Sequence, residues 1–194
     1  MNIGVLGGTF NPVHSGHTAI ASHVLNELRL DRVLFVPVKN PVHKKLDGNA
    51  SPVDRLAMLQ LAVEGVPFFE ADPIELEREG PSYTVHTLAA LKERHPESAL
   101  YFMLGADSFN ELDSWFDYAG ILNLALIVVM RRGGDELLRT DLIHRIPGLV
   151  QVNNDFINIS SSLVRRRLRE GRSVEGLVPD AVAMYIKNKG LYVQ

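Results

Sequence analysis

The stretch that decides the fold is GGTFNPVHSGH, from Gly7 to His17, which directly follows the apolar run Ile3 to Leu6. Such a run predicts a buried strand, and the residues after it have the spacing of a helix. Glycines in a strand-to-helix turn let an anion approach the main chain, and amide N–H groups at a helix N-terminus attract negative charge. His14 and His17 are three apart, so on a helix they would share one face and reach the same ligand oxygens. The segment predicts a phosphate-binding site at the end of a parallel strand.

The residues of this stretch alone leave two other interpretations open. A Gly-Gly turn is common in α/β proteins for structural reasons. A His-x-x-His pair can also bind a metal ion, although the zinc helix signature places its histidines four apart around a glutamate, and the chain has no cysteine. The phosphate loop ending in Gly-Lys-Ser/Thr and an intact Gly-x-Gly-x-x-Gly are both absent from the sequence.

Length and composition indicate an ordinary globular protein. The 194 residues suit one domain over 1–194, with a C-terminal helical part at about 160–194. Hydrophobic residues make up 46% and charged residues 22%, which are ordinary proportions for such a chain. The lack of cysteine excludes a disulfide scaffold and a thiol nucleophile, and it suits a reducing compartment, so we expect a cytoplasmic protein.

Charge and hydropathy argue against a membrane or nucleic acid as partner. The longest apolar run, from Ile121 to Met130, is too short to cross a bilayer and predicts a buried strand. We expect no targeting segment ahead of the first strand. A net charge of −3 argues against broad nucleic-acid binding. The sequence leaves the oligomeric state open, a homo-oligomer included.

Strand-like and helix-like segments alternate along the chain. Besides 3–6, the expected strands are 32–37, 99–104 and 124–130, and the expected helices are 15–28, 52–64, 84–94, 108–118, 160–169 and 179–189. This alternation predicts an α/β fold, a Rossmann-like doubly wound parallel sheet with helices on both faces. Ligands bind beyond the carboxyl ends of such strands, where Gly105 and Ile159 are also expected. Residues 38–51 are expected to form a loop.

A second group of polar residues lies in ISSSLVR, from Ile159 to Arg165. It places hydroxyl groups at a helix start and an arginine about one turn later. Serines in this position are often plain N-caps, and the arginines at 165, 166, 167 and 169 also suit a solvated helix face.

Together, the two segments resemble the motifs Gly-x-Phe-Asp/Asn-Pro-x-His-x-Gly-His and Ile-Ser-Ser-Thr-x-Ile-Arg of the nucleotidyltransferase superfamily. Ser162 replaces threonine and Val164 replaces isoleucine. Members of this superfamily transfer a nucleoside monophosphate from a nucleoside triphosphate to a phosphorylated acceptor.

Three further segments are similar to those of bacterial nicotinate mononucleotide adenylyltransferases, so the resemblance covers nearly the whole chain. They are Tyr83 to Thr87, Gly105 to Asp107 with Leu112 and Trp115, and the loop Pro37 to Lys44. The sequence departs from this pattern at Asn11, Val42 and His86. Val42, in place of a second proline, affects the stiffness of the loop.

The resemblance implies roles for individual residues. The catalytic group would be His14, His17 and Arg165. The ATP site would comprise Gly7, Gly8, Thr9, Phe10, Gly105, Asp107, Ile159, Ser160 and Ser161. The acceptor site would comprise Asn40, His43, Lys44, Tyr83, Thr84 and Trp115. From the residues alone, Trp115 equally suits a core position, Thr84 a helix cap and Lys44 a solvated loop.

The implied reaction joins AMP from ATP to nicotinate mononucleotide and releases pyrophosphate. The acceptor phosphate is already an anion, so no covalent enzyme intermediate is needed. Mg²⁺ is expected to bind through substrate phosphates, without a protein metal site. The alternatives are a phosphopantetheine or nicotinamide mononucleotide adenylyltransferase, a cytidylyltransferase, or a nucleotide-sensing module without catalysis.

Overall fold

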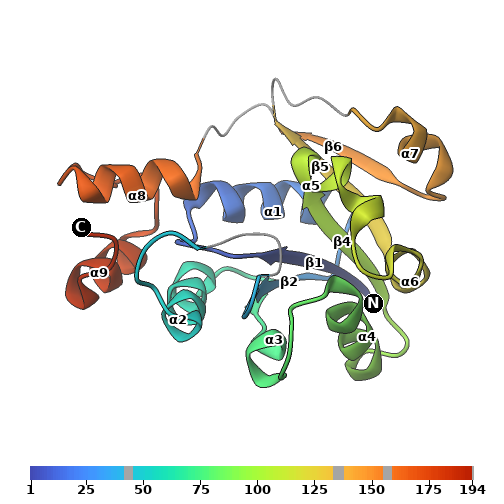
Figure 1. Cartoon of the computed structure of the whole chain (residues 1–194), viewed down its shortest axis with the longest axis horizontal. Helices are drawn as coiled ribbons and strands as arrows, with labels where there is room; N and C mark the ends of the chain where they lie inside the picture. Colours follow the sequence, from blue (N-terminus) through green and yellow to red (C-terminus); the bar gives the residue numbers. More distant parts are fainter. Residues whose placement is uncertain (42–45, 133–137, 155–158, 194) are drawn as a thin grey trace.

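A six-stranded parallel sheet forms the centre of the computed structural model, which describes residues 1–41, 46–132, 138–154 and 159–193 (Figure 1). The strand order is β3-β2-β1-β4-β5-β6, and every neighbouring pair is parallel. The strands are β1 (Asn2–Gly8), β2 (Arg32–Pro37), β3 (Phe69–Ala71), β4 (Ala99–Gly105), β5 (Leu126–Arg132) and β6 (Val150–Asn154). The order reverses between β1 and β4, and this switch point is where doubly wound sheets bind ligands. The expected fold class is confirmed.

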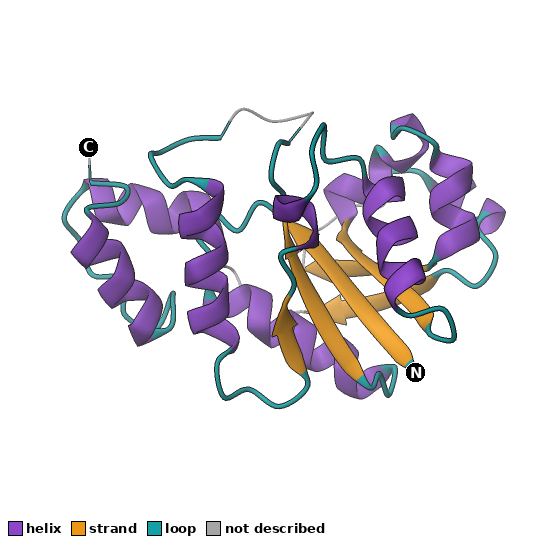
Figure 2. Ribbon diagram, turned by 90° about the horizontal axis from the view of Figure 1, so that it is seen from below, coloured by secondary structure: helices purple, strands orange, loops and turns teal. Residues whose placement is uncertain are grey.

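Helices cover both faces of the sheet (Figure 2). One apolar layer includes buried residues of α1 (Ser15–Glu27), α2 (Pro52–Val63), α8 (Ser161–Arg169) and α9 (Asp180–Lys189). The other includes residues of α3 (Ile74–Glu77), α4 (Thr84–Arg94), α5 (Ala106–Asn110), the 3-10 turn η1 (Leu112–Ser114), α6 (Tyr118–Leu124) and α7 (Thr140–Arg145). On β2, Val33 and Phe35 face the first layer and Leu34 and Val36 face the second. Because β2 is buried on both faces, its sequence is an almost continuous apolar run.

Local signals fix the helices and strands whose bounds agree best with expectation. Ser51 Oγ accepts a hydrogen bond from the Asp54 amide (3.1 Å), and the Ser51 amide donates to Asp54 Oδ2 (3.0 Å). This capping box and Pro52 at the first helical position define the start of α2. Strand β2 and helix α4 have the expected bounds.

The expected helix over 108–118 is wrong. Asp117 has a left-handed backbone (φ 49°), and its side chain accepts a hydrogen bond from Gly120 N (3.0 Å), which starts the new helix α6. Helix α6 continues to Leu124, so the apolar run 121–130 is part helix and part strand rather than one strand. The sequence reading also missed β3, α3, α7 and β6. Strand β3 has three residues and α3 one turn, which is too short for a periodic signal.

Candidate active site

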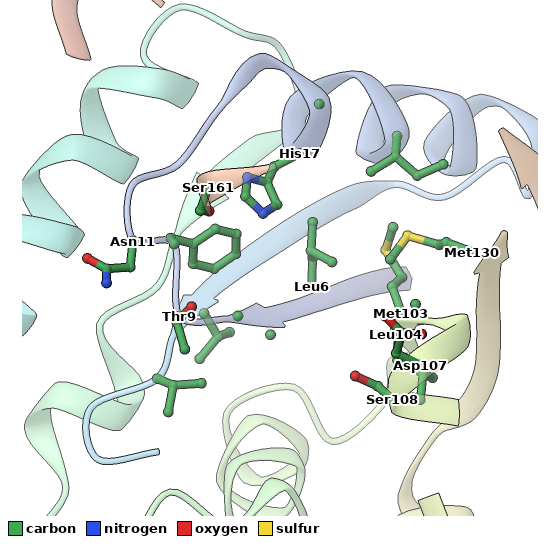
Figure 3. Close-up of a pocket in the computed structure, with 18 of the residues that line it drawn as sticks. Leu6, Thr9, Asn11, His17, Met103, Leu104, Asp107, Ser108, Met130 and Ser161 are labelled. Atoms are coloured by element: carbon green, nitrogen blue, oxygen red, sulfur yellow. The ribbon is translucent and has the colours of Figure 1, made fainter. Parts of the chain in front are cut away.

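A cavity of about 520 Å³ lies at the carboxyl ends of β1 and β4. Figure 3 shows Thr9, Asn11, His17 and Ser161 on one side of it, and Asp107, Ser108 and Met130 on the other. The expected site residues that line it are Gly7, Gly8, Thr9, Phe10, His14, His17, Thr84, Gly105, Asp107, Trp115, Ile159, Ser160, Ser161 and Arg165. Both motifs and part of the expected acceptor site therefore share one cavity.

Direct hydrogen bonds join the two motifs. Ser161 Oγ donates to the carbonyl oxygen of Pro12 (2.9 Å), and Arg165 Nη1 donates to that of Asn11 (2.7 Å). These contacts link residues 149 and 154 positions apart. The start of α8 is thereby fixed against the turn that follows β1.

The two histidines stack at the start of α1. Their ring centroids are 3.6 Å apart, and the backbone amide of His14 donates to His17 Nδ1 (3.1 Å). His14 is the N-cap with an extended backbone (φ −144°, ψ 164°), so it precedes the helix rather than sharing a helical face with His17. Because Nδ1 of His17 accepts a hydrogen bond, the neutral ring carries its proton on Nε2. His17 can therefore act as a hydrogen-bond donor.

Packing within the protein disfavours a side chain at Gly8 but not at Gly105. A Cβ on Gly8 would lie 3.1 Å from Cζ of Phe10. Phe10 has a left-handed backbone (φ 45°), and its buried ring meets the ring of His17 edge-on. A Cβ on Gly105 would meet no protein atom within 4 Å. Gly105 lines the cavity, so its Cα faces open space at the expected site.

Arg165 is buried, and each of its three nitrogens donates a hydrogen bond to a protein atom. Its Nε donates to Asp47 Oδ2 (3.1 Å) and its Nη2 to Ser162 Oγ (3.3 Å). Arg169 also donates to Asp47. The hydrogen bonds from Arg169 and then Arg165 hold the pKa of Asp47 below its usual value. One carboxylate therefore pairs with two guanidinium groups, and of these Arg165 lines the cavity.

Asn11 connects this wall to the C-terminal part of the chain. Its Nδ2 donates to the carbonyl of Asp47 (2.7 Å), and its Oδ1 accepts from the Tyr192 hydroxyl (2.6 Å). Burial raises the pKa of Tyr192, so the phenol stays protonated and remains a donor.

On the opposite side of the cavity lie Thr84 and Trp115. Thr84 is the first residue of α4, and Trp115 follows η1 with its half-buried ring edge-on to Phe102 (6.2 Å). Glu75 lines the same region. It is buried, and its Oε1 accepts a hydrogen bond from Thr87 Oγ1 (2.6 Å).

Two expected acceptor residues that the structure describes, Asn40 and Tyr83, are not among those that line the cavity. Asn40 bonds Ser82 and Gly80 at the edge of the site, and Tyr83 stacks on Phe116 (4.4 Å between centroids). His43 and Lys44 lie outside the described residues.

Other lining residues were not identified from the sequence. The polar and charged ones are Asn11, Asp47, Glu75, Ser82, Thr87, Ser108, Arg131 and Ser162. Asn11 and Ser162 lie within the motifs and could have been found there. Asp47 and Glu75 follow no motif, and their positions depend on how a loop and a one-turn helix pack.

Two structural features are absent from the described residues. No helix within the described ranges has both the length and the apolar character for a bilayer crossing. Within those same ranges, no three histidine, cysteine, aspartate or glutamate residues come together as a candidate metal site.

Comparison with known proteins agrees with this geometry. The family model described as cytidylyltransferase-like matches residues 5–167. A probable nicotinate-nucleotide adenylyltransferase of Dehalococcoides mccartyi is 43% identical over 199 residues, covering 99% of this chain and 97% of the relative. One of Citrifermentans bemidjiense is 37% identical over 215 residues, covering 100% and 99%.

A solved structure supports the fold. The nicotinic acid mononucleotide adenylyltransferase of Plasmodium falciparum, complexed with NaAD, superposes with a TM-score of 0.81 at 21% identity, covering 98% of this chain and 97% of that one. The fold, the shared cavity and the full-length similarity lead to one conclusion: the chain belongs to the cytidylyltransferase-like family, among the nicotinate-nucleotide adenylyltransferases.

Proposed function

We propose that this protein transfers AMP from ATP to nicotinate mononucleotide, giving nicotinate adenine dinucleotide and pyrophosphate in NAD biosynthesis. The observation that carries the proposal is the bonding of Ser161 to Pro12 and Arg165 to Asn11 at the wall of one cavity. A triphosphate bound at that wall would lie in the same cavity as Thr84 and Trp115, where the acceptor would bind. The full-length relatives named for this activity support the same conclusion.

In the proposed reaction, a 5′-phosphate oxygen of the acceptor attacks the α-phosphorus of ATP. The new P–O bond replaces the bond to the bridging oxygen, and pyrophosphate leaves with that electron pair. The protein must align two anions and place donors where negative charge develops. Nε2–H of His17, the imidazole of His14 and the remaining N–H groups of Arg165 would serve as these donors.

The other residues would bind the substrates. Gly7, Gly8, Thr9, Phe10, Gly105, Asp107, Ile159, Ser160 and Ser161 would contact ATP, and Asn40, His43, Lys44, Tyr83, Thr84 and Trp115 the acceptor. Ser160 Oγ accepts from the Leu163 amide (3.2 Å), so it caps α8 and keeps its own O–H proton for a phosphate oxygen.

The donor set of the cavity suits a magnesium ion that arrives with ATP. The carboxylates that line it, Asp47, Glu75 and Asp107, belong to different segments, and Asp47 is bound to two arginines. Phosphate oxygens and water would be the ligands, and the ion would reduce the charge of the triphosphate. Loss of activity in excess chelator and its return with Mg²⁺ would test this part.

The start of α4 favours nicotinate over nicotinamide. No side chain caps this helix end, and its first turn contains no acidic residue. Free amide N–H groups at a helix N-terminus favour a carboxylate. Thr84 brings this helix end to the cavity.

Pyrophosphate release tests the proposal directly. Purified protein with ATP and Mg²⁺ is offered nicotinate mononucleotide, nicotinamide mononucleotide or phosphopantetheine in parallel. We expect release to be fastest with nicotinate mononucleotide. Preference for another acceptor would reassign the substrate, and ATP binding without release with any acceptor would indicate a sensing module.

A cytoplasmic location belongs to the proposal and agrees with the cysteine-free composition.

A further inference from the structure

Arg55 is a fully buried arginine of α2 that the proposed reaction does not use. Its exposed fraction is 0%. Nη1 donates to the carbonyl oxygen of Thr9 (2.7 Å), and Nη2 lies 3.4 Å from that of Lys39. Within the described ranges, Nε makes no hydrogen bond and no carboxylate forms an ion pair with the side chain. Burying a guanidinium without a direct ion pair is costly: burial lowers the pKa of Arg55, and the charge of nearby Glu75 offsets only part of that effect. The position of this side chain therefore calls for a specific role.

The peptide between Lys39 and Asn40 shows what such a contact does. A planar trans peptide directs its C=O and N–H in opposite directions. The carbonyl of Lys39 faces Arg55, and the amide of Asn40 donates to Ser82 Oγ (3.0 Å). Both sides of this peptide therefore have partners within the protein.

The peptide between Thr9 and Phe10 has a partner on one side only. Its carbonyl faces Arg55, so the amide N–H of Phe10 must point the opposite way. No hydrogen bond from the Thr9 or Phe10 amide occurs within the described part of the chain. Both residues line the cavity. A donor held in place beside the cavity without an acceptor suits an anionic ligand.

We propose that Arg55 is a positioning residue that orients the Thr9–Phe10 peptide, so that the Phe10 amide donates to a phosphate oxygen of the bound nucleotide. Its second contact, to the Lys39 carbonyl, holds the segment after β2 in place beside this peptide. The inference rests on the proposed binding of ATP in this cavity.

Kinetics of two Arg55 variants test the inference. Arg55→Met keeps the volume but removes both donors, and we expect kcat/KM for ATP to fall about 10²-fold, the scale for misplacing a reacting group by about 1 Å. Arg55→Lys keeps the charge but loses the planar fork, so its loss should be smaller. Met58→Ala is the matched control, because Met58 is buried in the same helix and does not line the cavity. It should lower the melting temperature while leaving kcat/KM for ATP near the native value.

A spectroscopic readout separates positioning from general destabilisation. Labelling phenylalanine with ¹⁵N gives at most eight backbone amide signals, and Phe10→Leu assigns that of Phe10. Saturating ATP should shift this signal in the native protein and in Met58→Ala, and much less in Arg55→Met. If Arg55→Met does not fold, the ATP-dependent shift of the Phe10 signal in Arg55→Lys tests the role of Arg55 instead.

The outcomes distinguish the two proposals. An Arg55 variant that folds and shows the native kcat/KM and the native Phe10 shift would overturn the role of Arg55. A native protein that shows no ATP-dependent shift and releases no pyrophosphate would instead overturn the proposed function.

Discussion

Asp47 and Arg165 form an ion pair at the cavity wall, with 3.1 Å between Oδ2 and Nε. Arg169 binds the same carboxylate. The proposed triphosphate would bring further negative charge to this wall, so Asp47 and the nucleotide would compete for Arg165, which lines the cavity.

Asp47→Asn should therefore lower KM for ATP severalfold, because the incoming phosphates would no longer displace or repel a carboxylate. Steady-state kinetics with varied ATP measure the effect. Asp113→Asn is the matched control, since Asp113 pairs with Arg139 and does not line the cavity. An unchanged or higher KM in Asp47→Asn would show that this carboxylate orients the arginines without competing.

The same ion pairs predict a pH dependence of stability. The pKa of Asp47 is lower in the folded protein than in the unfolded chain, chiefly because of Arg169 and then Arg165. Its contribution is therefore present above the unfolded value of about 3.9 and is lost as the pH falls through the folded value. As the pH is lowered from about 6 to about 3, the melting temperature should fall less steeply for Asp47→Asn than for the native protein. Parallel curves would contradict the prediction.

His17→Ala should lower turnover by about 10²- to 10³-fold, the scale for removing one preorganised donor. His23→Ala is the control, because His23 lies on the same helix and pairs with Glu27 at the surface. Pyrophosphate release at saturating substrates measures both. Native turnover in His17→Ala would remove this residue from the proposed mechanism.

Gly105→Ala should fold normally and bind ATP weakly. The new methyl group meets no protein atom, and the backbone (φ −76°) is one that alanine adopts readily. Gly4→Ala should do the reverse, since its Cβ would lie 2.9 Å from Leu30 Cδ1 within the core. Melting temperature and KM for ATP separate the two. A Gly105→Ala variant with native ATP affinity would show that ATP does not bind against Gly105.

Trp115 provides a direct probe of the acceptor, because it is the sole tryptophan of the sequence. If it stacks on the pyridine ring, nicotinate mononucleotide should quench its fluorescence. Trp115→Ala should then raise KM for the acceptor while leaving KM for ATP near the native value. Neither quenching nor a changed acceptor affinity would assign Trp115 to packing against Phe102.

The sequence was sufficient to predict most of the sheet and one wall of the cavity. The apolar run before Gly7 and the helix starts at Ser51 and Ser160 are local signals, and each agrees with the structure. Two segments with phosphate-binding character had to meet at the carboxyl ends of parallel strands. The first segment follows the predicted strand 3–6, but strand β6 before the second segment was not predicted, so the family resemblance, and not sheet topology alone, implied that the two meet.

Other features depend on packing between distant segments. The expected helix over 108–118 ends at Asn110 and is followed by a 3-10 turn and an extended Trp115, and no periodicity signals this break. The buried position of Arg55, however, could have been predicted from the sequence. With Met58, Leu59 and Ala62 it completes the i, i+3, i+4, i+7 spacing of a buried helical face, so the position of this charge within an apolar stripe could have identified it.

The hydrogen bond from Tyr192 to Asn11 spans 181 positions in the chain. Contacts of such separation form late, because a long loop must close before they contribute. During synthesis on the ribosome, the loop after β1 emerges long before the tyrosine that fixes it. We therefore expect nucleotide to assist folding only after release of the C-terminal helices, and not to stabilise a nascent N-terminal half.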